Sequence, residues 1–450
     1  MSKTPALLFV LLCLTALCLV IPQPAKADAT TIVVPDDYSR VQEAIDAAND
    51  GDTVFVKKGI YQEPTLEINK SLSIIGENVY NTTLNLNPPL IEAFILRNWL
   101  WIPATAITIN ADNVKIQGFT INIPRGDYGF GGGLHASGDT IELIGNKIAN
   151  NGVYLSGISI SVADNSISGT LEVIGSNQTI ANNSIQKFLK IQGSHNKITC
   201  NTINEIIQLN GSSNLASGNS FFMLEMEDSS SNFIIDNFFE CLELEERGQF
   251  CSDNIIAKNQ ITGNGGFNSG IWVGSGSNNT VTANIIRDCD SGLRLTGAVT
   301  ENSVYLNNFV NNSINIQYYG DADWTLNNRF DNGTKGNYYD DYKGEDNNWD
   351  GIGDVPYTIK GTRWDSEAGG VVDAGFSQDR YPLMATVDVA SVTIQFPDWA
   401  AHSNPSPEPQ ASEPFLTTLV MASVIIVAVV GVGLLVYFKK SHIKSGVKRE

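Results

Sequence analysis

The sequence has few of the residues from which metal and redox sites are usually built. Its 450 residues include 6 cysteines, 5 methionines and 4 histidines. There is no CxxC pair and no Cys/His cluster, so a zinc site is not expected. Two cysteines lie in an N-terminal apolar run and the other four lie further along the chain. Of these four, Cys241 and Cys251 bracket a short loop, and in an exported protein they are the predicted disulfide pair.

Basic residues are also scarce. The chain has 28 Lys and Arg against 48 Asp and Glu, which gives a formal net charge of -20 at pH 7. Such an acidic chain is a poor partner for nucleic acid and for anionic lipid surfaces. Cations, basic proteins and neutral glycans remain open as partners. The simpler interpretation is that the acidity only keeps an exported protein soluble.

Helical periodicity is missing from most of the chain, and a repeat of asparagines is present instead. These asparagines recur at intervals of 18 to 25 residues, and each of the first series is followed two positions later by an apolar residue. The first series is Asn146, Asn165, Asn183, Asn201, Asn219, Asn237, Asn259, Asn284 and Asn308. A second series is Asn177, Asn196, Asn214, Asn232, Asn254 and Asn278. A fixed period of this kind is typical of a solenoid.

The repeat predicts an all-β fold, a single-stranded parallel β-helix of roughly eleven coils. Short β-like runs broken by Gly, Asn and Ser would be the strands. We expect the asparagines to lie at equivalent corners, to adopt the left-handed backbone conformation there, and to hydrogen-bond to one another along the stack. Coils of 18 residues would also suit a left-handed helix of hexapeptides. The hexapeptide pattern is not evident, so a right-handed helix is favoured.

Both ends of the chain differ from the repeats. Residues 1–27 have a basic start, a short apolar run and a small-x-small cleavage site, which predict a secretory signal peptide. Residues 415–438 carry no charge and are long enough for a transmembrane helix. The basic tail at 439–450 predicts a cytoplasmic C-terminus, with the bulk of the chain outside the cell membrane. A Pro-rich stretch at 401–414 is the expected linker.

The exported part begins with a pattern that predicts a helix followed by a strand. Apolar residues have helical spacing from Tyr38 to Asn49, Gly51-Asp52 ends the pattern, and Thr53 to Val56 begins a strand. The helix is expected to cap the open end of the first coil.

Segments at both ends of the repeats resemble a known family. Val41-Gln42-Glu43-Ala44-Ile45 and Ser71-Leu72-Ser73-Ile74-Ile75-Gly76-Glu77-Asn78 look like the opening of right-handed parallel β-helix proteins of the NosD-like, carbohydrate-binding and sugar-hydrolase type. Gly336-Asn337-Tyr338-Tyr339-Asp340-Asp341-Tyr342 and Asp379-Arg380-Tyr381-Pro382-Leu383-Met384 are similar to the closing segment of NosD-like surface proteins. The resemblance implies β-helix repeats with an N-terminal cap over residues 28–320 and a C-terminal cap over 321–400.

The resemblance also implies a link to copper-site maturation or to polysaccharide-degrading enzymes. Copper requires a cluster of His, Met or Cys ligands. The exported part has only His135, His195 and His402, and the spacing of Met223 and Met226 fits core filling better than ligation. The Gly-His-Gly and Arg-Ile-Lys elements of polygalacturonase-like members are absent. No catalytic residue is therefore assigned.

A calcium loop is predicted in the C-terminal cap, because oxygen-bearing residues alternate as in the first part of an EF-hand loop. The ligands would be Asp346, Asn348, Asp350, the carbonyl of Ile352 and Asp354. Gly351 permits the sharp turn. Tyr357 stands where the bidentate Glu is expected, so Asp340, Asp341 or Asp365 would have to complete the site. The alternative is an acidic, Gly-rich turn that binds no metal.

An acidic face is predicted where two strands carry paired glutamates one coil apart. The outward residues would be Glu225, Glu227, Glu243 and Glu245, and the inward ones Leu224, Met226, Leu242 and Leu244. Like charges on neighbouring strands repel each other. The face could bind a cation or a basic partner, or supply paired carboxylates for glycoside chemistry. It could also be a solvated face without a ligand.

Two further stretches could line a site. The loop from Arg125 to His135 could form a pocket wall, and Trp99 and Trp101 could stack on sugar rings or pack as a satellite core. Sequons for N-glycosylation occur at Asn69, Asn81, Asn177, Asn182, Asn210, Asn278, Asn311 and Asn332.

The sequence thus predicts a membrane-anchored extracellular β-helix that binds cell-envelope carbohydrate or a surface protein. A polysaccharide lyase or hydrolase, a copper-related accessory protein and a structural envelope component are the alternatives.

Overall fold

The computed structural model describes residues 29–95, 98–103, 105–124, 133–244, 251–263, 269–297, 299–319, 327–365, 367 and 369–397. The predicted signal peptide, linker, membrane span and basic tail lie outside these residues. Within them, no helix has the length and apolar character needed to cross a bilayer. The compact unit that contains the β-structure extends to Ile394.

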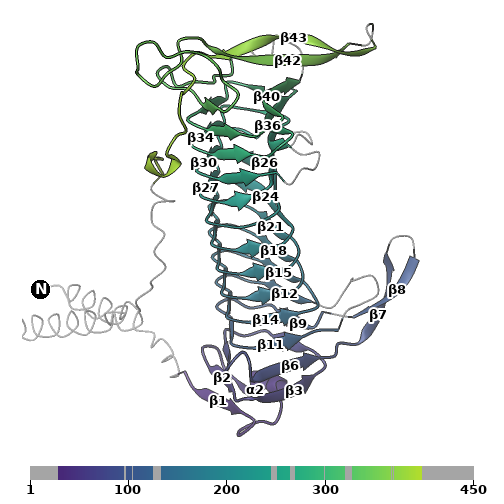
Figure 1. The fold of residues 1–450 in the computed structure, drawn as a ribbon. Helices are drawn as coiled ribbons and strands as arrows, with labels where there is room; N and C mark the ends of the chain where they lie inside the picture. The colour runs from purple at the N-terminus through teal and green to yellow at the C-terminus, as the bar shows by residue number, and fades with distance from the viewer. Residues whose placement is uncertain are drawn as a thin grey trace, which may run out of the picture. The chain divides into compact units, whose positions relative to one another are not determined.

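The described chain winds into a parallel β-solenoid whose coils contribute strands to three sheets, A, B and C (Figure 1). Sheet A has 13 strands, somewhat more than the roughly eleven coils predicted from the repeat. The parallel β-helix prediction is confirmed, and its right-handed sense stays a prediction.

Sheet A consists of β1 (Thr31–Val34), β2 (Thr53–Val56), β5 (Ser73–Gly76), β10 (Lys115–Gln117), β13 (Glu142–Ile144), β16 (Ser161–Ala163), β19 (Thr179–Ala181), β22 (Lys197–Thr199), β25 (Leu215–Ser217), β27 (Phe233–Ile235), β30 (Ile255–Ala257), β34 (Thr280–Thr282) and β38 (Ser303–Tyr305). Sheet B consists of β3 (Gly59–Glu63), β6 (Thr82–Leu86), β11 (Thr120–Asn122), β14 (Lys147–Ala149), β17 (Ser166–Ile167), β20 (Ser184–Ile185) and β23 (Thr202–Ile203), and, beyond a single bridging residue at Ser220, of β28 (Phe238–Phe239), β31 (Gln260–Thr262), β35 (Ile285–Arg287), β39 (Asn308–Val310) and β41 (Tyr338–Tyr339).

Sheet C consists of β4 (Leu66–Ile68), β9 (Ile107–Ile109), β12 (Leu134–Ser137), β15 (Val153–Ser156), β18 (Leu171–Ile174), β21 (Leu189–Gln192), β24 (Ile206–Ser212), β26 (Met223–Ser230), β29 (Cys241–Leu244), β32 (Ser269–Val273), β36 (Ser291–Thr296), β40 (Ile314–Tyr319), β42 (Tyr357–Asp365) and β43 (Gly370–Asp379). Outside the three sheets lie the helix α2 (Val41–Ala47), the antiparallel pair β7 (Leu90–Ile95) and β8 (Asn98–Pro103), the short pair β33 (Gly276–Ser277) and β37 (Val299–Thr300), and the 3-10 helix η3 (Val389–Ser391).

The core is a set of apolar stacks, because inward positions repeat from coil to coil. In sheet B, Ile148 pairs with Ile167, which pairs with Ile185, and all three are buried. Each such side chain contributes about 1.5 to 3 kcal/mol of burial free energy. The predicted rule, an apolar residue two positions after each ladder asparagine, is thus a consequence of strand alternation.

The first asparagine series forms a continuous hydrogen-bonded ladder inside the solenoid. The backbone N–H of Asn183 and its Nδ2 both donate to Oδ1 of Asn201, each at 2.9 Å, and Nδ2 also donates to the carbonyl of Val162 at 2.8 Å. The same pattern links consecutive ladder residues from Asn146 onward. Amides that would otherwise be buried without partners are therefore satisfied by the neighbouring coil.

The last position of this ladder was predicted wrongly by one residue. The ladder passes from Asn284 to Asn307 and then to Asn337, whereas Asn308 points elsewhere and contacts Val387. The inward apolar residue is accordingly Phe309, which is buried, and not Val310.

The second series forms a parallel ladder with two similar corrections. Gln178 occupies the rung predicted for Asn177, and its N–H donates to Oδ1 of Asn196. Asn279 occupies the rung predicted for Asn278. The ladder then continues through Asn302 to Asn328.

The left-handed backbone is at the residue before most rungs, not at the rung itself. Asn177, Asn278 and His195 have φ values of 61°, 57° and 60°, and each directly precedes a ladder residue. In the first ladder Asn182, with φ 56°, does the same before Asn183. The tight turn thus directs the side chain of the following residue inward. The prediction that the ladder asparagines themselves adopt the left-handed conformation was wrong, because the preceding residues adopt it.

The helix α2 lies inside the predicted helical stretch. Val41, Ala44 and Ile45 are buried against the first strands. The buried carboxylate of Glu63 accepts the N–H of Val41 and pairs with Arg40, so it satisfies the start of the helix. The role of this helix as a cap stays a prediction.

The C-terminal end of the solenoid is closed by a hairpin and by a returning segment. β42 and β43 form an antiparallel hairpin that extends sheet C (Figure 1). After it, the backbone of Val387 makes two hydrogen bonds with the side chain of Asn308, and Lys258 donates to the carbonyl of Ala390. We call residues 385–391 the strap.

Candidate functional site

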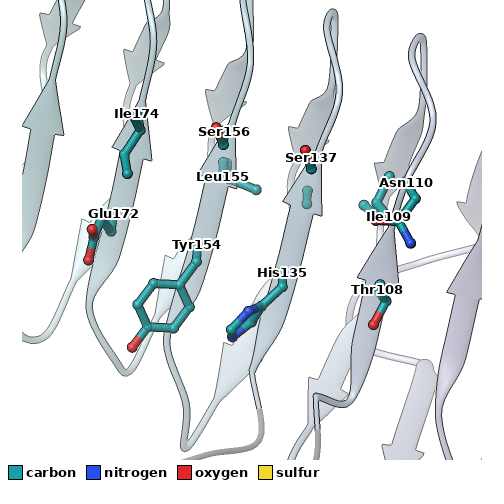
Figure 2. Close-up of a pocket in the computed structure, with 11 residues that line it drawn as sticks. Thr108, Ile109, Asn110, His135, Ser137, Tyr154, Leu155, Ser156, Glu172 and Ile174 are labelled. Atoms are coloured by element: carbon teal, nitrogen blue, oxygen red, sulfur yellow. The ribbon is translucent and has the colours of Figure 1, made fainter.

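A cleft of about 260 Å³ lies on the outer face of sheet C, over β9, β12, β15 and β18 (Figure 2). Strand register places His135 beside Tyr154, and Tyr154 beside Glu172. Because side chains alternate along a strand, the three project from the same face. Ser156 and Ile174 belong to a second outward row of the cleft (Figure 2).

The aromatic part of the cleft is partly exposed and carries no charge at neutral pH. The ring centroids of His135 and Tyr154 are 4.8 Å apart, with 52° between the ring planes. Partial burial lowers the pKa of His135, so its imidazole is neutral at pH 7. Burial, and then the charge of Glu172, raise the pKa of Tyr154. Two rings, one of them 40% exposed, therefore lie beside a single carboxylate.

The cleft belongs to a longer row on sheet C. The row is Glu67, Thr108, His135, Tyr154, Glu172, Lys190, Gln208, Glu225, Glu243, Trp272, Arg294 and Gln317. Sequence reasoning placed His135 only in a loop and did not single out Tyr154. A signal was available, since His135, Tyr154 and Glu172 each precede a rung of the first ladder by the same number of residues.

The predicted acidic face has the expected register where it is described. Glu225 lies directly opposite Glu243, with Leu224, Met226, Leu242 and Leu244 buried beneath. Nε2 of Gln208 donates to Glu225 at 2.7 Å, which offsets part of the repulsion between the two carboxylates. Glu227 is partly exposed on the neighbouring row, and Glu245 lies outside the described residues.

In the predicted calcium loop the carboxylates accept hydrogen bonds from their own loop. Asp346 accepts hydrogen bonds from the backbone N–H groups of Asp350 and Gly351. Asp354 accepts hydrogen bonds from the backbone N–H and the side-chain Nδ2 of Asn347. Asp350 accepts the N–H of Ile352, and the amide of Asn348 donates to Asp350. Among the described residues, no three His, Cys, Asp or Glu side chains converge as a metal site.

The residues expected to complete that loop are engaged elsewhere. Asp340 accepts the N–H of Asn311, and Asp341 accepts the amide of Asn315. The side chain of Asp365 is outside the described part.

The predicted disulfide between Cys241 and Cys251 is not formed, and both residues are buried thiols. The Sγ of Cys251 donates to the carbonyl of Met226, while Cys241 is at the start of β29 and contacts Glu243. The two thiols thus have different hydrogen-bond partners, and neither is bonded to the other. Burial raises the pKa of each of them, so both thiols stay protonated and unreactive at neutral pH.

Two other predicted stretches are only partly described. Residues 125–132 of the Arg125–His135 loop lie outside the described residues, although His135 itself is in the cleft. Trp99 and Trp101 belong to β8, whose side chains are not described.

A family model described as periplasmic copper-binding protein (NosD) matches residues 133–344. A curated relative, the probable ABC transporter binding protein NosD of Stutzerimonas stutzeri, is 26% identical over 164 residues. That match covers 31% of this chain and 35% of the relative, so the chain spans about a third of the length of the relative.

Several solved structures are similar in fold. DFA-IIIase from Arthrobacter chlorophenolicus A6 in complex with GF2 has a TM-score of 0.44 and 14% identity, covering 68% of this chain and 95% of that chain. The A-module of mannuronan C-5 epimerase AlgE4 from Azotobacter vinelandii has a TM-score of 0.35 and 14% identity, covering 66% and 89%. PfbA, a surface adhesin of Streptococcus pneumoniae, has a TM-score of 0.32 and 13% identity, covering 77% and 98%. Similarities this distant support no functional argument.

Copper ligands do not gather in the described part of the chain. His135 lies on sheet C, whereas His195 lies at an exposed corner between β21 and β22. Met226 is fully buried, and no three His, Cys, Asp or Glu side chains of the described residues converge. These residues therefore do not fit a copper site. In fold the described chain is a parallel β-solenoid, and over residues 133–344 its sequence is similar to the NosD family.

Proposed function

We propose that the protein is an extracytoplasmic β-helix that binds carbohydrate in the sheet C cleft. The observation that carries the proposal is the row of His135, Tyr154 and Glu172 on three successive coils. A partly exposed tyrosine ring can stack on the apolar face of a sugar, and the flanking carboxylate can accept bonds from its hydroxyl groups. Serines of the second row add neutral hydrogen-bonding groups at the same spacing.

A glycan array followed by calorimetry tests the proposal. The purified full-length protein is screened on the array, and the glycan with the strongest signal is titrated. Loss of the ring in Tyr154→Ala should weaken binding about two- to tenfold, because aromatic contacts are worth roughly 0.5 to 1.5 kcal/mol. Tyr154→Phe should retain most of the affinity.

Tyr80→Ala is the matched control, since Tyr80 is 87% exposed and lies far from the cleft in the sequence. Unchanged affinity in both Tyr154→Ala and Glu172→Gln would place the glycan elsewhere on the molecule and contradict the proposal.

A carbohydrate-active enzyme is the second candidate, and the neutral His135 beside Tyr154 is the observation that favours it. At neutral pH the imidazole can accept a proton and the tyrosine hydroxyl is protonated, because burial lowers the pKa of His135 and raises that of Tyr154. Such a lyase or hydrolase would release unsaturated or reducing ends from polysaccharides. His135→Gln would abolish this release but would leave binding largely intact.

Calcium binding at the loop from Asp346 to Asp354 remains our proposal for the C-terminal end. Calcium would have to replace some of the hydrogen bonds that now close the loop, because the same carboxylate oxygens are involved. Titration with calcium should give a saturable heat that Asp350→Ala removes. Identical heats for the two proteins would contradict calcium binding by this loop.

A further inference from the structure

A second hollow region lies at the C-terminal end of sheet A. It consists of two adjoining clefts of about 510 Å³ and 580 Å³, which share Ser303 and Arg329. Ser303 belongs to β38, the last strand of the sheet, and forms an isolated parallel bridge with Arg329. The backbone of Arg329 also donates to Asn302 and accepts from Val304, each at 2.8 Å. The base of the cleft is therefore held as an extension of the sheet.

One wall of the cleft is an arginine whose orientation is fixed by a buried carboxylate. Nε and Nη2 of Arg380 donate to the two oxygens of Asp331, at 2.9 Å and 2.6 Å. The side chain of Asp331 is 3% exposed and that of Arg380 is 59% exposed. The guanidinium also lies 5.4 Å from the ring centroid of Tyr381. Its remaining N–H groups are thus held in place and open to solvent.

Arg329 supplies a second cationic group to the same cleft. Its side chain is exposed, and no described carboxylate lies within ion-pair distance of it. Glu301 lines the adjoining cleft without pairing with Arg329. Two guanidinium groups, one pre-oriented and one unpaired, therefore line a cleft in a protein whose formal net charge is -20.

The rest of the lining offers neutral hydrogen-bonding groups. Ser303, Tyr305 and Asn332 contribute hydroxyl and amide groups to the cleft. Ligand pockets are usually lined by apolar side chains, and this one is not. Its chemistry suits a ligand that combines one anionic group with several hydroxyl groups.

We propose that this cleft binds an acidic sugar, with the anionic group between Arg329 and Arg380 and the ring hydroxyls on the neutral side chains. Arginine forks match the geometry of a carboxylate. A uronic acid is the simplest ligand with these features. The inference is independent of the sheet C cleft, because the two share no residue.

Calorimetry and saturation-transfer NMR on the full-length protein test the proposal. The probes are glucuronate, glucose and glucose 6-sulfate. We expect glucuronate to bind, and glucose to give no signal that depends on Arg329. Arg329→Gln should weaken glucuronate binding about tenfold or more, because hydrogen bonds to charged groups are worth roughly 1.5 to 3 kcal/mol. Arg329→Lys should weaken it less, since the charge is kept.

Arg287→Gln is the matched control, because Arg287 is half-exposed on sheet B and pairs with Asp288. Tyr154→Ala should leave the part of glucuronate binding that depends on Arg329 intact, which separates this site from the sheet C cleft. Binding of glucose 6-sulfate would extend the ligand class to sulfated sugars. The proposal is overturned if glucuronate does not bind, if Arg329→Gln weakens glucose binding as much as glucuronate binding, or if Arg329→Gln binds glucuronate as tightly as the unchanged protein.

Discussion

Asp379 occupies the last rung of the first ladder, where the earlier coils place an asparagine. Its Oδ2 accepts the backbone N–H of Asn337 at 2.7 Å and the hydroxyl of Tyr339 at 3.2 Å. The side chain is fully buried, and burial raises the pKa of Asp379 to about 6 although several hydrogen bonds oppose the shift. The neighbouring Gly336 is required here, since a Cβ at that position would overlap the carboxylate.

The raised pKa makes this residue a source of pH dependence. A carboxyl group whose pKa is higher in the folded state stabilises the fold below its unfolded value of 3.8 and loses that contribution as the pH rises through about 6. The loss amounts to about 2.4 kcal/mol between pH 4 and pH 8. Asp379→Asn should remove this dependence of stability on pH. In thermal unfolding, the melting temperature of the variant should therefore rise relative to that of the unchanged protein between pH 4 and pH 8.

Asp331→Asn is the control with the opposite sign. Burial opposes the shift, but the hydrogen bonds from Arg380 outweigh it and lower the pKa of Asp331. Removing this carboxylate should cost more stability at pH 7 than at pH 3. If both variants show the same pH trend, the assignment of Asp379 is incorrect.

The rungs show what can be predicted at the level of single residues. The sequence contains doublets such as Asn177-Gln178, Asn278-Asn279 and Asn307-Asn308, and spacing alone does not tell which member points inward. The deciding factor is the left-handed residue at each corner, which turns its successor toward the core. Recognising that corner first would have placed the rungs correctly.

At the level of elements, the strap is held by Asn308, which directly follows the rung Asn307. Substitutions at these two neighbours can therefore be compared. Asn308→Ala removes both hydrogen bonds to Val387 and leaves the ladder intact. We expect faster hydrogen exchange at residues 385–391 with little change in the melting temperature.

Asn307→Ala should instead lower the stability of the whole solenoid, because it removes a rung of the ladder. The backbone N–H and Nδ2 of Asn284 both lose their acceptor, Oδ1 of Asn307, inside the core. Together these two losses should cost about 3 kcal/mol or more of the free energy of unfolding. The melting temperature should therefore fall markedly. Equal effects of the two substitutions would contradict the separate roles given to these neighbours.

The acidic face and the arginine cleft differ in how far the sequence pattern of strands and repeats could predict them. The opposition of Glu225 and Glu243 follows from strand alternation and the repeat, so sequence reasoning found it. The cleft of Arg329 and Arg380 brings together residues from β38, a loop and the end of a hairpin. No repeat relates these positions, so only the folded chain shows that they meet.

At the level of the whole molecule, attachment to a membrane through residues 415–438 is our proposal. These residues are long and apolar enough for a span, and the basic residues after them would remain on the cytoplasmic side. The full-length protein should stay in the membrane pellet after an alkaline carbonate wash. A chain that ends at residue 397 should be released, and recovery of the full-length protein in the wash would contradict the proposal.

The ladders bond each coil only to its immediate neighbours, and in the middle of the stack the rungs are 18 residues apart. Removing or duplicating one such unit would leave every remaining rung with a partner of the same kind. The height of the stack would change by about 4.8 Å each time. Insertion or deletion of whole coils would therefore change the distance between the sheet C cleft and the arginine cleft in steps of one coil height.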